Sequence, residues 1–117
     1  MDISKTFTIG EEHGGELKQH RGSTELDTDE KDYWYLSPGA YEIVMENIIN
    51  VGADEAGWVI TRSTFNRNGL FITSGLYDSG YHGVMAGALH ITSPARIKKG
   101  TRVGQFILFK SQSLKQY

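Results

Sequence analysis

The chain has 117 residues and no cysteine, with 14 acidic side chains against 12 lysines and arginines. This length supports a single domain, residues 1–117, around one core. The near balance of charge excludes an overall field that would draw the chain to nucleic acid or to an anionic membrane. No apolar run approaches the roughly 18 residues of a membrane span. The missing cysteine excludes disulfides and thiolate catalysis and fits a reducing cytoplasm, where we expect the protein to act.

Residues 11–31, EEHGGELKQHRGSTELDTDEK, are polar and nearly free of apolar side chains. A segment of this composition buries too little apolar surface to pack by itself. We therefore expect an exposed loop or a long hairpin excursion whose charges are solvated. At the other end of the sequence, residues 111–117 are expected to form a short tail.

From Tyr33 onward, short apolar runs alternate with Gly, Pro, Asn and Asp. This pattern is typical of an all-β sandwich or barrel. The candidate strands are residues 40–46, 58–61, 70–74, 84–92 and 102–110.

The stretch SPGAYEIVMENIINV, residues 37–51, fits two structures. Its apolar side chains recur at helical spacing, and Ser37 followed by Pro38 is a good helix start. Against a helix, Gly39 would weaken the first turn, and the β-branched isoleucines and valines favour a pleated strand. We prefer the strand.

Arg62 and Ser63 follow the predicted strand at residues 58–61. Arginine offers a planar fork of donors that suits phosphate oxygens, and a serine hydroxyl with turn amides can complete an anion site. Arg67 lies five residues beyond Arg62, and Gly69 allows the backbone to turn or to approach another group closely. A structural or merely solvated turn remains the alternative for these residues taken alone.

Two further polar segments accompany this one. Residues 75–83, GLYDSGYHG, combine Asp78 with two tyrosines and three glycines, although aspartate is also common in turns because it bonds nearby amides. The segment KKGTR, residues 98–102, leads into VGQFILFK, where Gln105 is polar within an apolar run. A buried glutamine needs partners for its amide, so Gln105 is expected to bond the backbone or to face a ligand.

Together, RSTFNRNGL, GLYDSGYHG and IKKGTRVGQFILF have the order and spacing of three motifs of one family. The chain resembles the superfamily of dUTP diphosphatases and dCTP deaminases from about Tyr35 to Lys110, and the upstream YLSPGAYEIVMENIINVGADEAGWVITRS resembles its deaminase branch. The resemblance implies a distorted β jelly roll of the β-clip type, assembled as a homotrimer with nucleotide sites between subunits. The ligand would be a deoxyribonucleoside triphosphate.

The resemblance also implies roles for individual residues. Ser63 and its neighbours, including Arg67, would bind phosphate oxygens, and Arg62 would support this binding or a subunit contact. Gln105 would help to fix the phosphates or the base. Asp78 would contact the deoxyribose hydroxyl and orient the attacking water.

Tyr81 would lie against the sugar and exclude a 2′-hydroxyl. The backbone around Gly75 would read the pyrimidine edge. A magnesium ion would bind through the substrate phosphates, because their charge opposes attack on phosphorus. The protein itself shows no metal-site spacing among His13, His20, His82 and His90.

The sequence departs from the family pattern at four places. Ala88 stands where the deaminases carry a catalytic glutamate, and a methyl group cannot shuttle protons, so dCTP deamination is not expected. KSQSLKQY after Phe109 lacks the glycine-rich arm of the diphosphatases. The first family motif is not recognisable, and His82 occupies a position where the diphosphatases usually carry arginine.

Two hypotheses therefore stay open. The first is a minimal dUTP diphosphatase that releases dUMP and pyrophosphate, with Asp78 as its catalytic group. The second is a catalytically degenerate trimer on the same scaffold, which binds a nucleotide or acts in regulation, structure or protein interaction.

Overall fold

The fold is seen in a computed structural model that describes residues 2–4, 12–13, 16–17 and 25–111, with side chains described from residue 25 onward. The described chain is almost entirely β-strand, as the sequence predicts. Within these residues the single helix is α1 (Ser63–Arg67), which is five residues long. Nothing in the described part of the chain offers a helix with the length and apolar content that crossing a bilayer requires.

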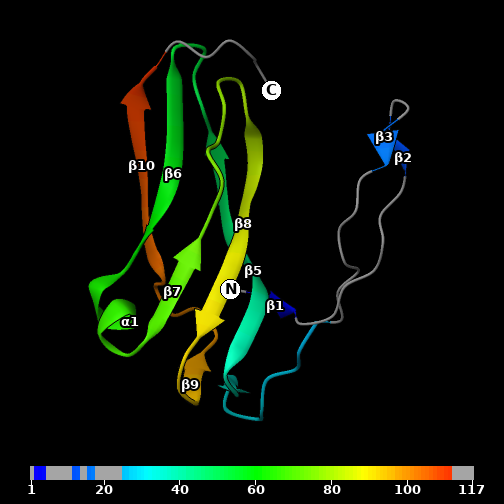
Figure 1. Cartoon of the computed structure of the whole chain (residues 1–117), viewed down its shortest axis with the longest axis vertical. Coiled ribbons are helices and arrows are strands. Elements are labelled where there is room, and N and C mark those ends of the chain that lie inside the picture. Colours follow the sequence, from blue (N-terminus) through cyan, green and yellow to red (C-terminus); the bar gives the residue numbers. More distant parts are fainter. Residues whose placement is uncertain (1, 5–11, 14–15, 18–24, 112–117) are drawn as a thin grey trace.

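The largest sheet has four antiparallel strands in the order β1-β5-β8-β7 (Figure 1). Its members are β1 (Asp2–Ser4), β5 (Gly39–Asn50), β8 (His82–Ile91) and β7 (Leu70–Thr73). The long strands β5 and β8 form the centre of this sheet, and β7 continues it towards the second sheet.

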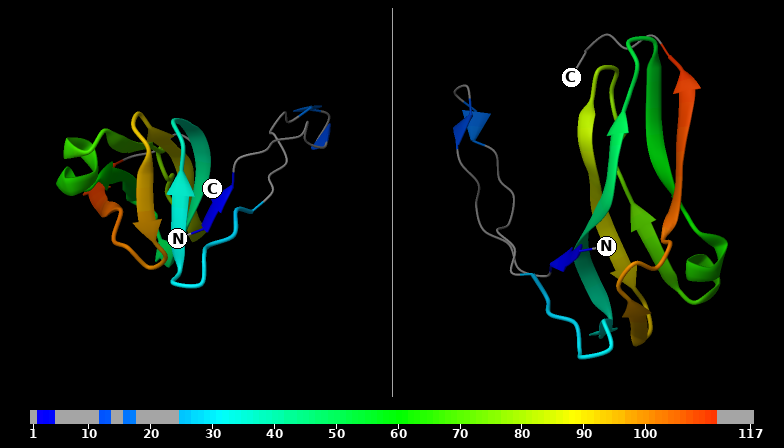
Figure 2. Two further views of the ribbon diagram at one scale, coloured as in Figure 1. Left: turned by 90° about the horizontal axis from the view of Figure 1, so that it is seen from below. Right: turned by 180° about the vertical axis from the view of Figure 1, so that it is seen from behind.

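The second sheet pairs β6 (Glu55–Thr61) with β10 (Gly104–Lys110), and β4 (Tyr33–Leu36) pairs with β9 (Ala95–Lys98). The view from behind shows β6 and β10 running alongside β5 and β8, with α1 at the same end of the molecule as β9 (Figure 2). Each of these pairs joins segments far apart in sequence, so long-range pairing dominates the topology.

The predicted polar excursion at residues 11–31 lies partly outside the described residues. Two short strands within it, β2 (Glu12–His13) and β3 (Glu16–Leu17), pair with each other. Residues 25–31 are described, and Leu26 packs against the core while its carbonyl accepts a hydrogen bond from the indole of Trp34 at 2.8 Å. The predicted tail at residues 111–117 falls outside the described residues from 112 onward.

The prediction of a strand at residues 37–51 is confirmed. Tyr41, Ile43 and Met45 are buried while the residues between them are partly exposed, which is the two-residue alternation of a strand with one face on the core. The same inward face continues onto β8, where Leu89 is fully buried opposite Tyr41. The alternation changes after Met45, because β5 bulges between Val44 and Ile48.

The five predicted strands all form, but other elements escape the sequence pattern, among them β1, β4, β9 and α1. Strands β4 and β9 are four residues each and pair only with one another, so no local signal marks them. The helix α1 was expected as a turn; it forms because Phe65 is buried, with 6% of its surface exposed, and because the Phe65 and Asn66 amides donate to the Arg62 carbonyl.

A threonine hydroxyl joins the two main sheets. The Thr61 hydroxyl on β6 donates to the carbonyl of Ile72 at 3.2 Å and accepts from the amide of the same residue at 2.9 Å. Ile72 lies on β7, the last strand of the four-stranded sheet. The hydroxyl therefore occupies the position of a backbone partner and satisfies both polar groups of one edge residue.

The hydroxyl of Tyr77 likewise bonds both backbone polar groups of one residue, on the neighbouring strand β8. The backbone of Tyr77 forms an isolated bridge with Gly57 on β6, at 2.7 and 3.1 Å, while its phenol donates to the Ala86 carbonyl at 2.9 Å and accepts from the Ala86 amide at 2.8 Å. Its ring also meets Phe106 edge-on, with centroids 5.9 Å apart. Tyr77 thus connects β6, β8 and β10.

We predict that Thr61→Val lowers the free energy of unfolding by about 1–2 kcal/mol, because valine keeps the shape but leaves the amide and carbonyl of Ile72 unsatisfied. Urea unfolding followed by circular dichroism measures the loss. Thr64→Val is the control, since this exposed threonine on α1 makes no such bridge, and it should change stability by less than about 0.5 kcal/mol. Equal losses in both variants would contradict the bridging role.

Tyr77→Phe is expected to cost about 1–3 kcal/mol, since the phenol alone satisfies the amide and carbonyl of Ala86. Hydrogen exchange should report faster exchange at the Ala86 amide, with smaller changes at amides of β10. The comparison is Tyr35→Phe, which removes a hydroxyl from a side chain that is 65% exposed. An unchanged exchange rate at Ala86 would show that the bond does not protect this edge.

Burial raises the pKa of the Tyr77 phenol above its ordinary value of 10.0. In the unfolded chain the phenol therefore ionises at a lower pH than in the folded chain, so stability is lost as pH rises above about 10. Alkaline unfolding monitored by circular dichroism should show a shallower decline for Tyr77→Phe than for the unmodified protein. A decline of the same steepness in both would rule out Tyr77 as its source.

Candidate functional site

The residues predicted from the sequence fall into two groups in the structure. The first group surrounds the end of β6, where the Arg62 amide donates to the Val103 carbonyl at 2.9 Å and its guanidinium donates to the Arg102 carbonyl at 3.2 Å. The pairing of β6 with β10 then sets Gln105 opposite Ile60. The structure therefore brings the Arg62–Ser63 segment beside the segment that carries Gln105.

The helix α1 presents polar side chains from this end. Ser63 is its first residue and Arg67 its last, and both side chains are exposed. Phe65 anchors the helix in the core from the opposite face. Gly69 follows with φ of 75°, and a Cβ atom there would lie 2.2 Å from the hydroxyl of Thr92, so the turn after α1 requires glycine.

Gln105 is exposed, so it is not the buried glutamine that its apolar neighbours suggested. Alternation along β10 turns Phe106 towards the core and Gln105 to the outer face. On that face Trp58 and Ile60 are each 47% exposed, and the ring of Trp58 lies 5.8 Å from that of Phe109. The apolar side chains around Gln105 thus lie on both faces of β10, and only one of these faces meets the core.

The second group lies in the connection between β7 and β8, which contains Gly75, Asp78 and Tyr81. Gly75 is exposed, with open space where a side chain would stand. Asp78 is partly buried, and its carbonyl accepts the Tyr81 amide at 3.1 Å. The connection contains one fully buried polar residue, Ser79, whose hydroxyl donates to the Glu55 carbonyl at 2.6 Å.

Further backbone bonds attach this connection to Val51, the residue that directly follows β5. The Val51 amide donates to the Tyr81 carbonyl at 2.8 Å, and the Gly80 amide donates to the Val51 carbonyl at 2.9 Å. Tyr81 packs against Tyr77 with ring centroids 5.0 Å apart, and its hydroxyl donates to the Val84 carbonyl. The turn that carries Asp78 is therefore held by several bonds rather than left open.

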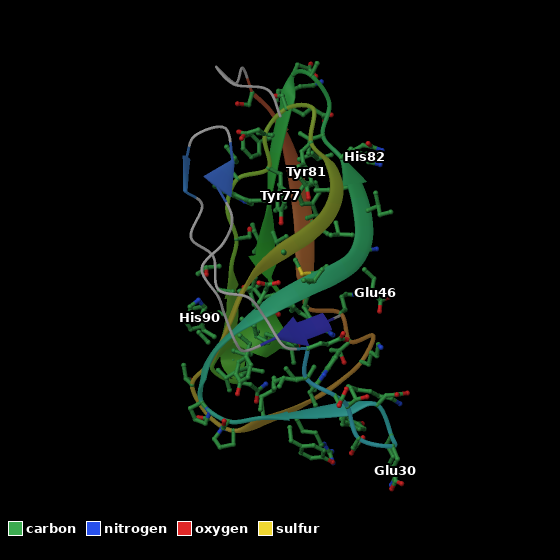
Figure 3. All side chains as sticks on the ribbon, turned by 90° about the vertical axis from the view of Figure 1, so that its right-hand side faces the viewer. Glu30, Glu46, Tyr77, Tyr81, His82 and His90 are labelled. Carbon is green, nitrogen blue, oxygen red and sulfur yellow. The ribbon has the colours of Figure 1, made fainter. Side chains whose placement is uncertain are left out.

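The two groups lie at opposite ends of β6. Tyr77 bridges Gly57 near the start of the strand, whereas Thr61, its last residue, leads into Arg62. Four residues of an antiparallel strand span roughly 14 Å. Figure 3 accordingly shows Tyr77 and Tyr81 together at one end of the molecule. Within one chain, Asp78 does not meet Ser63 or Gln105.

The position of Ala88 adds a carboxylate that the sequence pattern did not reveal. Ala88 on β8 is directly paired with Glu42 on β5 and with Thr73 on β7. Directly opposite residues of antiparallel strands project from the same face, so Glu42 shares a face with Ala88. Only the pairing of two strands separated by more than 30 residues could disclose this neighbour.

The described histidines make local contacts. His82 contacts the side-chain amide of Asn50, and His90 stacks on Phe71 with centroids 4.6 Å apart and bonds the Thr73 hydroxyl at 3.0 Å. Among the described residues, no cluster of three or more His, Asp or Glu side chains is arranged to hold a metal ion. His20 lies outside the described residues, and His13 is described by its backbone alone.

Comparisons with known proteins bear on this arrangement. The sequence profile of the dCTP deaminase-like family matches residues 2–111. A probable deoxyuridine 5′-triphosphate nucleotidohydrolase of Methanococcoides burtonii is 31% identical over 94 residues, which are 76% of this chain and 55% of the relative.

A protein of the same description from Halobacterium salinarum is 30% identical over 73 residues, covering 62% of this chain and 44% of the relative. The deoxyuridine 5′-triphosphate nucleotidohydrolase of Methanocaldococcus jannaschii is 27% identical over 92 residues, covering 78% and 59%. The chain spans about half the length of these curated relatives. Because the family profile matches almost the whole sequence, and the predicted resemblance is confirmed, this chain belongs to the dCTP deaminase-like family.

Proposed function

We propose that this protein hydrolyses a deoxyribonucleoside triphosphate, with dUTP as substrate and dUMP and pyrophosphate as products. The names of its relatives as deoxyuridine 5′-triphosphate nucleotidohydrolases support this proposal. The structural observation that carries it is the side-by-side placement of the Arg62–Ser63 segment and the Val103–Gln105 segment. This placement supports an anion site at this end of β6, to which Arg62 would bring a guanidinium, Ser63 a hydroxyl and Gln105 an amide.

The proposed reaction adds water to the α-phosphorus. The water oxygen forms a bond to that phosphorus, the bond from the α-phosphorus to the bridging oxygen breaks, and pyrophosphate leaves. The Asp78 carboxylate accepts the proton of the water as it attacks. Magnesium bound through the phosphates would offset their charge. The protein contributes Ser63, Arg62, Arg67 and Gln105 as phosphate-binding groups.

A second copy of the chain completes the proposed site. Asp78 lies at the far end of β6 from Ser63, so the carboxylate and the phosphate site meet only across a contact between copies. We propose the homotrimer of the jelly-roll type that the family resemblance implies. The outer face of β6 and β10 supports such a contact, because Trp58, Ile60 and Phe109 are exposed there beside Gln105.

The turn of Asp78 supplies the selectivity in this proposal. Its hydrogen bonds to Val51 and Glu55 fix the backbone at residues 75–81, which reads the pyrimidine edge. Tyr81 lies against the sugar, where its ring leaves no space for a 2′-hydroxyl. A rigid turn suits this role because a preformed edge loses little conformational freedom on binding.

The second candidate is a catalytically degenerate module that binds a nucleotide, or acts in regulation or structure, without hydrolysis. The separation of Asp78 from Ser63 within one chain favours it, since hydrolysis needs both at one phosphate. Binding of phosphates by Arg62 and Ser63 does not require Asp78.

Incubation with magnesium and each of dUTP, dCTP, dTTP, dATP and UTP tests the proposal by measuring pyrophosphate release. We expect release from dUTP, little from UTP, and a loss of roughly 10²- to 10⁴-fold in Asp78→Asn. The control Asp27→Asn changes an exposed carboxylate in the same way and should keep full activity. Release of ammonia from dCTP is also measured, because it reports deamination. Glu42 lies beside Ala88, the position at which the deaminases carry their glutamate.

Release of pyrophosphate that survives Asp78→Asn would contradict the assignment of that residue. Saturable thermal stabilisation by nucleotide without any turnover would favour the degenerate binding module. If the protein shows no turnover and no stabilisation by nucleotide, a structural or protein-binding role remains.

A further inference from the structure

An open groove of about 860 Å³ lies between α1 and β9. Figure 1 shows these two elements at the same end of the molecule, away from the connection between β7 and β8 that carries Asp78. We call this groove the α1–β9 groove. It is walled by Thr64, Arg67 and Asn68 on one side and by Tyr33, Arg96 and Lys98 on the other. Its volume lies in the range of sites that hold a small molecule, roughly 300–1,000 Å³.

Three cations from two elements face this groove. Arg67 ends α1, while Arg96 and Lys98 are two residues apart on β9 and therefore project from the same face of the strand. The residue between them, Ile97, is buried, which fixes the orientation of its neighbours. The strand thus holds two positive charges towards α1.

An aromatic ring organises two of these cations. The guanidinium carbon of Arg96 lies 4.6 Å from the centre of the Tyr33 ring, and the ammonium of Lys98 lies 5.8 Å from it. Tyr33 pairs directly with Lys98 in the β4–β9 register. Ring contacts attract both cations, but the cations repel each other, and an anion between them would relieve that repulsion.

Little negative charge within the described chain balances the groove. In residues 25–111, Arg67, Arg96 and Lys98 form no ion pair with a carboxylate. Asp29 faces Arg96 at longer range, and its carboxylate accepts the amides of Lys31 and Tyr33, both at 2.9 Å. With Asp29 counted against Arg67, Arg96 and Lys98, two positive charges remain in local excess, although the whole chain carries a net charge of −2.

We propose that the α1–β9 groove binds polyphosphate, and that Arg96 and Lys98 are binding residues for it together with Arg67. Arginine forks match the geometry of phosphate oxygens, and lysine adds a compact charge. A single phosphate would meet only part of a groove this wide, whereas a chain of phosphates reaches both walls. Nucleic acid fits less well, because a concave site with three cations falls short of the 6–10 phosphate contacts that such binding commonly uses.

The identity of the natural ligand rests on the proposed function. Ser63 begins α1 and Arg67 ends it, and four residues of helix rise about 6 Å. A triphosphate bound near Ser63 could therefore extend along α1 into the groove. In this bound arrangement Arg96 and Lys98 hold the distal phosphates, which leave as pyrophosphate.

The experiment titrates the full chain with tripolyphosphate, pyrophosphate and orthophosphate by isothermal calorimetry. The variants are Arg96→Gln, Lys98→Gln and their combination, with Lys110→Gln as the control. Lys110 is an exposed cation at the opposite end of the molecule, paired with Asp54 at 2.9 Å. Thermal unfolding checks that each variant is folded, which is expected because the side chains of Arg96 and Lys98 are exposed.

We expect tripolyphosphate to bind more tightly than orthophosphate, and each groove substitution to weaken its binding roughly tenfold. Lys110→Gln should leave the affinity unchanged. No saturable binding of tripolyphosphate, equal binding by all variants, or an equal loss in Lys110→Gln would each overturn the proposal. So would a single-stranded oligonucleotide that binds more tightly than tripolyphosphate and depends on the same two residues.

Measurements with dUTP separate this inference from the proposed function. If the protein releases no pyrophosphate from dUTP, yet tripolyphosphate binding depends on Arg96 and Lys98, the groove stands and the hydrolase proposal fails. If dUTP is hydrolysed and the double variant keeps the KM of the unmodified protein, the hydrolase stands and the assignment of the distal phosphates of dUTP to the groove fails.

Discussion

The fold depends on two side-chain hydroxyls that complete backbone pairing where the strands stop pairing with one another. Strand β7 is four residues long and pairs only with the last part of β8. Ile72 therefore has polar groups on the open edge of β7, and Ala86 lies beyond the part of β8 that β7 covers. Thr61 bonds both polar groups of Ile72, and Tyr77 bonds both polar groups of Ala86. The bonds to Ile72 are partly buried, and a backbone group shielded from water without a partner costs free energy comparable to a lost hydrogen bond. These two hydroxyls therefore hold the sheets together.

Because both connections involve β6, this strand also fixes where the functional segments lie. Its beginning is attached to the turn of Asp78 through Gly57 and Tyr77, and its end leads into Arg62 and α1. The strand is extended and paired along its length with β10, so it cannot shorten to bring the two segments together. A site that needs both must be shared between copies of the chain, and the proposed trimer follows from this constraint as much as from family resemblance.

The sequence identifies strands well where one face is buried along a long run. Residues 39–50 are the clearest case, since β-branched side chains and a Pro-Gly start outweigh a helical spacing that is also present. The sequence does not reveal β4 and β9, because four-residue strands take their stability from a partner some 60 residues away. Pairing between segments distant in sequence also explains why Glu42 beside Ala88 and the cations of the α1–β9 groove escape detection.

Gln105 and Tyr77 show most clearly why local sequence does not predict every contact of a residue. Gln105 sits in an apolar run and is nevertheless exposed, because β10 presents apolar side chains on both faces and only one face meets the core. Tyr77 resembles any aromatic residue in a glycine-rich turn, yet its backbone and its hydroxyl bond two different strands. Local sequence sets which residues are apolar, whereas the partner of each face is set by the packing of distant segments.

The balanced net charge conceals an uneven distribution that matters for any shared site. Cations gather around α1 and β9, where Arg62, Arg67, Arg96 and Lys98 lie. The other end carries Asp54, Glu55 and Asp78, which are joined through the turns at residues 51–55 and 78–81, while Asp29 and Glu30 lie at the cationic end. An overall charge of −2 gives no long-range field for nucleic acid. In the proposed assembly, the opposite charges of Asp78 and of the cations near α1 would favour a contact between copies. Such a contact would set the Asp78 carboxylate of one copy beside the phosphate-binding end of its neighbour, which is the geometry that hydrolysis requires.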